Sequence, residues 1–185
     1  MNIQRSLWFV ATLVLGFGTT AMADDTGKAA ARRQEIDAAA QTTLDKLTKD
    51  DADASELLSK AVGYAVFTVT KAGFIVSAGA GNGVAVDKAS GKRTYMRMGL
   101  GGVGLGIGGQ RYGLVVMFEN RDRMDKFVAG GWDSSATAEA AAGKEGKAAR
   151  TTFYDGVAYY QITDKGLMAH ADITGTKFWI NDDLR

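Results

Sequence analysis

Cysteine and proline are both absent from the 185 residues, and histidine occurs once, at position 170. Without cysteine there is no thiol nucleophile, no zinc site that needs thiolates and no disulfide, so the fold must be stabilised by packing. A single histidine supplies too few ligands for a metal centre. No acid–base constellation stands out, which argues against an enzyme, and no metal or other cofactor is expected.

The apolar run at the N-terminus is too short for a comfortable membrane span. It covers residues 7–17, whereas a spanning helix needs roughly 20 apolar residues. The run follows the basic residue Arg5 and precedes Ala21-Met22-Ala23, which is the layout of a secretory signal peptide. We predict a signal peptide over residues 1–23 that is cleaved after Ala23, with an uncleaved anchor as the alternative. An exported chain in the periplasm or outer envelope of a Gram-negative bacterium is then expected, with residues 24–185 forming a single domain.

The exported chain has no excess charge of either sign, because 21 basic residues balance 21 acidic ones. This balance argues against a nucleic-acid-binding protein, which is usually strongly basic. The distribution is uneven: residues 61–130 carry nine basic and four acidic side chains, and the segments on either side are net acidic. The basic middle block is suited to an anionic surface.

Helical patterns occupy the N-terminal part and one short internal segment. We predict N-terminal helices within residues 27–62, the first of which has a narrow apolar stripe. Asp53 and Glu56 predict a capping box at the start of the second helix. Asn120 predicts the cap of a helix over residues 120–130, which Gly130 and Gly131 are placed to end. The members of the stripe, at helical spacing, are Ile36, Ala40, Leu44 and Leu47.

Strand texture fills a Gly-rich region over residues 63–119 and returns at residues 151–181. The strands are joined by short turns such as residues 88–92, which indicates antiparallel pairing because parallel neighbours need long crossovers. The variable segment 131–150 is small and polar and fits a loop or a loosely held helix. The predicted fold class is α+β: a strongly curved, Gly-rich antiparallel sheet or barrel-like β structure, packed by a few helices.

Alternating glycines are the most informative feature of the β region. Residues two apart in a strand share a face, so alternation leaves one face as bare main chain. Each strand glycine is unfavourable by roughly 0.5–1 kcal/mol relative to alanine, so another group must approach that face closely. One interpretation is a tightly coiled sheet with a helix against it, and the other is a groove where a lipid meets main chain. The candidate close-approach glycines form two sets, which we read as one strand each: Gly79, Gly81 and Gly83, and Gly102, Gly104, Gly106 and Gly108.

A G-x-G-x-x-G pattern at Gly99, Gly101 and Gly104 does not indicate a nucleotide site. The dinucleotide fingerprint requires a helix directly after the glycines, whose N-terminus holds the pyrophosphate. Here the chain continues with further glycines and then a strand-like run, so structural glycine is the better interpretation.

Basic side chains are the candidate lipid contacts. A solvated surface is the usual role of such residues, but each basic residue near an anionic membrane adds about 1 kcal/mol of attraction. The candidates from the first helix and the basic block are Lys28, Arg32, Arg33, Lys71, Lys92, Arg93 and Arg97.

Several segments, taken in order, resemble the SYLF domain family over roughly residues 55–185. The opening of the family is similar to residues 61–67 (AVGYAVF) and 71–74 (KAGF), and its middle to residues 106–118 (GIGGQRYGLVVMF) and 127–133 (FVAGGWD). Its end is similar to residues 160–167 (YQITDKGL) and 173–179 (ITGTKFW).

The resemblance implies a lipid-binding module. Eukaryotic members bind phosphoinositides and other anionic lipids through an amphipathic N-terminal helix and basic residues, and some yeast members bind actin. By position, these roles would fall to Lys28, Arg32, Arg33 and Lys71. The chain departs from the family in its weak helical stripe and its lack of proline.

The sequence therefore predicts a non-catalytic protein of the bacterial envelope that binds anionic phospholipid headgroups at a membrane surface. The alternative is a structural or protein-interaction component of the envelope, with a protein partner and no lipid ligand.

Overall fold

The computed structural model describes residues 20–73, 76–103, 108–130, 132–133, 152–163, 166–168 and 175–185. Two helices come first, α1 (Thr20–Asp50) and α2 (Ala52–Lys60), and a third, α3 (Arg121–Val128), follows the fourth strand. The strands are β1 (Gly63–Gly73), β2 (Val76–Asp87), β3 (Arg93–Val103), β4 (Gly108–Phe118), β5 (Trp132–Asp133), β6 (Val157–Thr163), β7 (Gly166–Met168) and β8 (Thr176–Ile180). A 3-10 helix, η2 (Asp182–Leu184), ends the chain.

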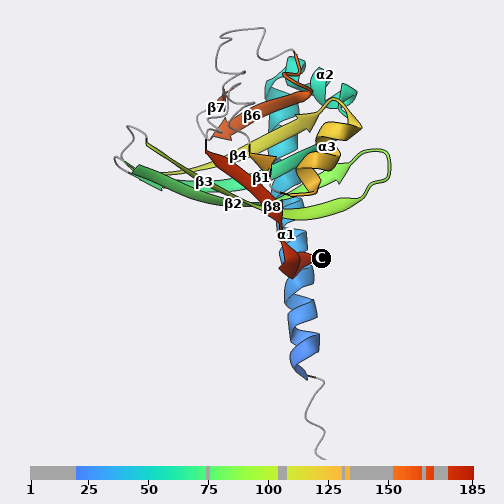
Figure 1. Ribbon diagram of the computed structural model, residues 1–185, viewed down its shortest axis with the longest axis vertical. Helices are drawn as coiled ribbons and strands as arrows, with labels where there is room; N and C mark the ends of the chain where they lie inside the picture. The colour runs from blue at the N-terminus through green and yellow to red at the C-terminus, as the bar shows by residue number, and fades with distance from the viewer. Residues whose placement is uncertain are drawn as a thin grey trace, which may run out of the picture.

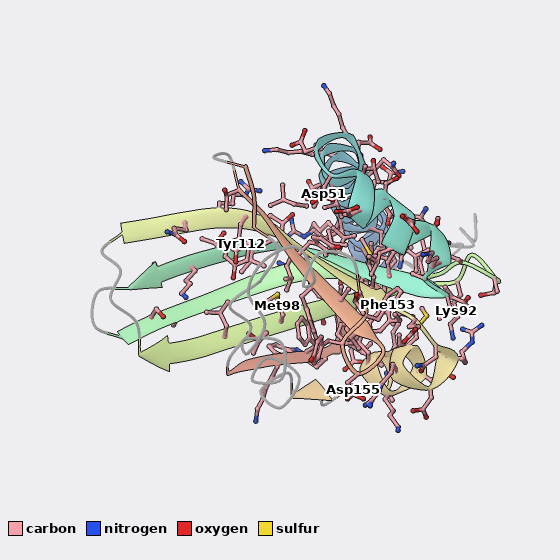
Figure 2. The ribbon with its side chains drawn as sticks, turned by 90° about the horizontal axis from the view of Figure 1, so that it is seen from above. Asp51, Lys92, Met98, Tyr112, Phe153 and Asp155 are labelled. Atoms are coloured by element: carbon pink, nitrogen blue, oxygen red, sulfur yellow. The ribbon has the colours of Figure 1, made fainter. Side chains whose placement is uncertain are left out.

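The strands form one open antiparallel sheet in the order β5-β8-β3-β2-β1-β4-β6-β7. Six strands have five or more residues, and β5 and β7 are short strands at the two edges. The sheet does not close on itself, and with the three helices it makes the predicted α+β fold. Helices α1 and α2 cover one face and α3 lies on the other (Figures 1 and 2).

Each face of the sheet has its own core, because successive side chains of a strand point to opposite faces. The face under α1 and α2, here called the helix face, buries Val66, Val84 and Val115 against the predicted stripe of α1. All four stripe residues are buried, with exposed fractions of 0–7%. The opposite face, here called the dry face, packs four phenylalanine rings together with Met124 of α3. The stripe of α1 is therefore a packing surface on the sheet.

The caps of the two short helices illustrate one correct prediction and one wrong one. Asn120 caps α3 by accepting a hydrogen bond from the main-chain nitrogen of Arg123 at 3.1 Å, as predicted. The cap of α2 is Asp51, which accepts from Ala54 at 2.8 Å, and not Asp53, which lies in the first turn. Asp51 takes this role because its main chain is extended (φ −144°, ψ 110°), the conformation that lets the side chain reach the free N–H groups.

Helix α1 begins earlier than the sequence pattern predicted and extends well past the sheet (Figure 1). Its first residues lie in the stretch expected to leave with the signal peptide, so an exported chain would keep the helix from residue 24 onward. Among the helices of the described segments, none combines the length and the apolar character needed to cross a bilayer.

The second glycine set does not lie on one strand. Gly102 belongs to β3 and pairs with Ser77, whereas Gly108 begins β4 and pairs with Gly73. Strands β3 and β4 are separated by β2 and β1 in the sheet. Gly104 and Gly106 lie outside the described residues. The prediction of one continuous strand is wrong, because β3 ends at Val103 and β4 begins at Gly108. Glycine is compatible with a chain reversal as well as with a strand, so the alternation alone did not fix the strand bounds.

Candidate functional site

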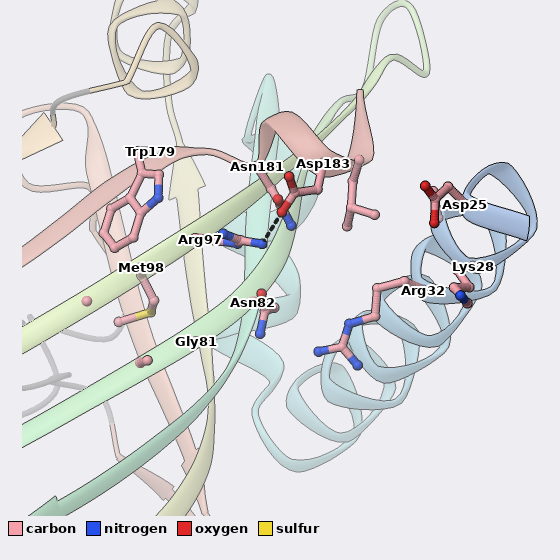
Figure 3. Close-up of a pocket in the computed structure, with 14 residues that line it drawn as sticks. Asp25, Lys28, Arg32, Gly81, Asn82, Arg97, Met98, Trp179, Asn181 and Asp183 are labelled. Carbon is pink, nitrogen blue, oxygen red and sulfur yellow. Dashed lines mark hydrogen bonds and ion pairs between the residues drawn. The ribbon is translucent and has the colours of Figure 1, made fainter. Parts of the chain in front are cut away.

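A cleft lies between the N-terminal half of α1 and the helix face of β2, β3 and β8 (Figure 3). We call it the α1 cleft. Its volume is about 810 Å3, within the range of small-ligand sites. The first buried residue of the apolar stripe of α1 is Ile36, and in the preceding turns the small Ala29 is only partly buried against the helix-face core.

Basic side chains from two distant parts of the chain line the polar end of the cleft. Arg32 extends from α1 toward the sheet, and Arg97 extends from β3 toward η2 (Figure 3). Arg97 forms an ion pair with Asp183 at 2.5 Å, and Arg32 forms one with Glu35 at 2.8 Å. Both pairs are solvent-exposed, and such pairs contribute about 0.2–1 kcal/mol, so an incoming anion can compete for either guanidinium.

The other end of the cleft is apolar and poor in side chains. Trp179 of β8 has 42% of its surface exposed, and it is the one large hydrophobic residue in the described part of the chain that is exposed to this degree. Its ring lies above Gly99, where an added Cβ would come within 3.2 Å of the indole Cη2. Ala80 and Gly81 continue this bare stretch on β2.

A second cleft, of about 470 Å3, adjoins the first across the C-terminal residues. We call it the β3 cleft. Arg93 forms an ion pair with Asp37 of α1 at 2.7 Å, and the Tyr95 hydroxyl donates to the same carboxylate at 3.0 Å. The hydrogen bond and charge of Asp37 raise the pKa of Arg93, so this side chain stays cationic. Burial, then the hydrogen bond to Asp37, raises the pKa of Tyr95, so its hydroxyl remains a donor at neutral pH.

The C-terminal segment separates the two clefts and is held from both sides. Arg33 of α1 donates to the main-chain oxygens of Leu184 and Arg185 at 3.4 and 3.3 Å. Asn181 lies in the wall that the clefts share and is only 4% exposed. Its amide oxygen accepts no hydrogen bond from the described residues.

Six of the seven predicted basic residues fall in these two clefts. Lys28, Arg32 and Arg97 line the α1 cleft. Arg33, Lys92 and Arg93 line the β3 cleft, together with Arg185. The seventh, Lys71, lies near the end of β1 and lines neither cleft.

The predicted close-approach glycines have several different environments. On the dry face, an added Cβ at Gly83 would clash with Phe67, and Cβ atoms at Gly81 and Gly79 would approach Met98 at 2.8 Å and Leu100 at 3.1 Å. The same strand exposes main chain to the α1 cleft at Gly81. No described atom lies within 4 Å of a Cβ placed on Gly102.

Sequence reasoning missed the residues that complete the site. Trp179 and Lys177 alternate with Phe178, which is buried on the dry face, so Trp179 lies on the helix face. This alternation is visible in the sequence and could have identified Trp179. Nothing local marks Asn181 or Asp183. Gly113 was also missed: an added Cβ there would lie 2.6 Å from Cγ2 of Thr43, so α1 lies close against the sheet at this point.

The arrangement is suited to holding an anion by charge and hydrogen bonds. The described residues contain no group of three or more His, Cys, Asp or Glu side chains that could hold a metal ion. His170 lies outside them.

Comparison with known proteins finds one matching family and one similar bacterial protein. Residues 99–184 match the family Ysc84, described as Las17-binding protein actin regulator. The chain is also 41% identical over 152 residues to Beta cell expansion factor A of Aeromonas veronii. That alignment covers 82% of this chain and 58% of the relative, so the chain spans somewhat over half the relative's length. The matched family segment includes Gly99, Trp179 and Asp183, whereas α1 precedes it. Over residues 99–184 the chain therefore matches the Ysc84 (SYLF) family, in agreement with the resemblance seen in its sequence.

Proposed function

We propose that the protein binds anionic phospholipid without catalysing a reaction on it, and that the basic residues of the α1 and β3 clefts contact the headgroup. The observation that carries this proposal is the gathering of six basic side chains from α1, β3 and the β2–β3 turn around one C-terminal segment. The family match supports a binding role for lipid or protein in general terms.

The electrostatics of the clefts favour an exchangeable anion. Three cations and two carboxylates, Asp25 and Asp183, line the α1 cleft. When a phosphate takes the place of a carboxylate beside one of these cations, the released carboxylate is exposed and is hydrated by water. Breaking the original ion pair therefore has only a small free-energy cost. Each basic residue near an anionic lipid surface contributes about 1 kcal/mol, so three or four contribute about 3–4 kcal/mol to membrane attraction.

Liposome co-sedimentation tests the proposal. The full chain is expressed from its own start and incubated with vesicles of neutral phosphatidylcholine, alone or with phosphatidic acid. We expect recovery on the acidic vesicles only, falling as salt is added. Equal recovery on both vesicle types contradicts the proposal.

A matched pair of charge reversals locates the contact. Arg32→Glu with Arg97→Glu should weaken binding to acidic vesicles by about tenfold or more, since two attractive charges become repulsive. Two reversals elsewhere, Lys60→Glu on α2 and Lys126→Glu on α3, change the net charge equally, replace residues of exposed helix ion pairs and lie away from the clefts. If both double variants lose the same affinity, net charge and not the clefts governs binding.

We also propose an exported protein of the Gram-negative envelope, based on the N-terminal pattern. Cell fractionation and an intact mass test this: the secreted form should begin at Asp24. A full-length mass in the cytoplasmic fraction contradicts it.

A protein-binding role in the envelope is the second candidate, favoured by the description of the matched family as a binder of the protein Las17. Purification under native conditions separates the two. Co-purified phospholipid seen by native mass spectrometry supports lipid binding, whereas a stoichiometric protein partner without lipid supports the alternative.

A further inference from the structure

Trp179 exposes its ring to the α1 cleft, although burial of a large aromatic side chain is favourable. The neighbouring large side chain of β8, Phe178, is fully buried on the dry face. Trp179 thus offers an apolar surface on the same face as Arg97, within the same cleft.

The main chain beside Trp179 is bare because Gly99, Gly81 and Ala80 carry little or no side chain. A larger residue at position 99 would push against the indole, since even a Cβ would lie 3.2 Å from it. The edge of the indole therefore rests on the bare main chain of Gly99, and the cleft beside the exposed ring is lined on β2 by Ala80 and Gly81. A narrow apolar group in the cleft would contact both the indole and the strand main chain.

The polar end of the cleft lies within reach of the same ligand. Arg32 and Arg97 approach from opposite walls, with Asn82 of β2 between them (Figure 3). Their present partners, Glu35 and Asp183, have exposed fractions of 66% and 74%, so neither guanidinium is held in a buried pair. The cleft combines an anion-binding end with an apolar end.

We infer that the α1 cleft takes one anionic lipid molecule at a time, with its phosphate at Arg32 and Arg97 and the first carbons of its acyl chain against Trp179 and Gly99. This inference rests on the proposed function and specifies how the lipid is held. A flat bilayer surface touches only outward-facing charges, whereas the cleft is walled by α1 on one side and the sheet on the other. A free phosphate would leave Trp179 uncovered.

Two soluble probes with the same phosphomonoester test the inference. Dihexanoyl phosphatidic acid, used below its micelle concentration, carries short acyl chains, and glycerol 3-phosphate carries none. Isothermal calorimetry on the full chain should give at least about tenfold tighter binding for the short-chain lipid. The lipid should also shift tryptophan emission to shorter wavelength, and the shift should be lost in Trp179→Phe.

A second variant narrows the cleft without removing a charge. Gly99→Val should weaken binding of the short-chain lipid about tenfold, with an unchanged circular dichroism spectrum, and should leave weak binding of glycerol 3-phosphate as it was. Equal affinity for the two probes overturns the inference, as does an emission shift that persists in Trp179→Phe. Where acidic vesicles are bound but the soluble lipid is not, the inference fails and the proposed function stands. Where neither is bound, both fail.

Discussion

The two faces of the sheet both contain strand glycines, but the surroundings of those glycines differ. On the dry face, side chains of the neighbouring strands occupy the space above the glycines of β2. The ring of Phe127 packs against Phe118 on one side and Phe178 on the other, with centroids 4.9 Å apart in each pair. On the helix face, α1 crosses the sheet and leaves clefts beside it that contain charged side chains. The glycines of the dry face therefore serve packing, whereas Gly99 on the helix face admits the edge of Trp179 beside the α1 cleft.

The comparison shows that a bare strand position has no fixed meaning. Gly83 and Gly99 lie on adjacent strands and point to opposite faces. The first is covered by Phe67, whereas the second has only the edge of Trp179 above it. What decides the role of each glycine is the side chain that the neighbouring strand sends across it.

The largest effect is expected on the dry face. Gly83→Val should destabilise the protein by about 3 kcal/mol or more, because its side chain would clash with the main chain of Val66 and the ring of Phe67. Urea denaturation measures the loss. Gly102→Ala is the control and should change stability by less than about 0.5 kcal/mol, since no described atom is within 4 Å of the new Cβ. If both variants lost the same free energy of unfolding, the effect would come from replacing glycine itself and not from the clash with Phe67.

The next largest loss of stability is expected where α1 contacts the helix face at Gly113. Gly113→Ala should destabilise by about 1–3 kcal/mol, because its Cβ would lie 2.6 Å from Cγ2 of Thr43. Thr43→Ala removes that methyl group, so the double variant should recover most of the loss. A double-mutant cycle by chemical denaturation measures the coupling. If the two changes are additive, the helix does not press on the sheet at this point.

Much of the fold could be predicted because its signals are local. The stripe of α1, the cap at Asn120 and the β2–β3 turn each depend on residues a few positions apart, and the structure confirms them. The cap of α2 was misassigned because Asp51 and Asp53 are equally good caps in sequence, and main-chain conformation decides between them. The break between β3 and β4 was missed because glycines in a strand and in a reversal look alike.

The site could be predicted only by residue type. Basic residues were the right class to consider, but their grouping depends on α1 crossing β3 beside the C-terminal segment, through contacts between residues more than 50 positions apart. Trp179 has a period-2 signal, yet only the tertiary fold brings it over Gly99. Lys71 has the right charge and no cleft.

Asp87, the last residue of β2, forms an ion pair with Arg121 of α3 at 2.8 Å, and its contribution to stability should depend on pH. Hydrogen bonds from Arg121, then from Ser90, hold the pKa of its carboxyl well below the usual range. A lowered folded-state pKa stabilises the fold above the unfolded pKa of about 3.9, and this contribution is lost as pH falls through the folded value. Asp87→Asn should therefore melt below the native protein at pH 7, with a gap that narrows below about pH 4. Thermal melts between pH 2 and 7 measure it, and a gap independent of pH contradicts the role of the charge.

The smallest change in stability should accompany a gain in binding. Asp183→Asn removes the carboxylate that pairs with Arg97 at 2.5 Å, and because both side chains are exposed the stability should change by less than about 1 kcal/mol. The freed guanidinium and the lost negative charge should raise affinity for acidic vesicles by about fivefold, the equivalent of about 1 kcal/mol per charge near the lipid. Asp122→Asn on α3 is the matched control, since it removes the same charge from an exposed pair on the dry-face helix. If only Asp183→Asn raises the affinity for acidic vesicles, the lipid binds on the helix face. If Asp122→Asn raises it equally, the lipid responds to net charge, and the difference between the two faces does not determine where it binds.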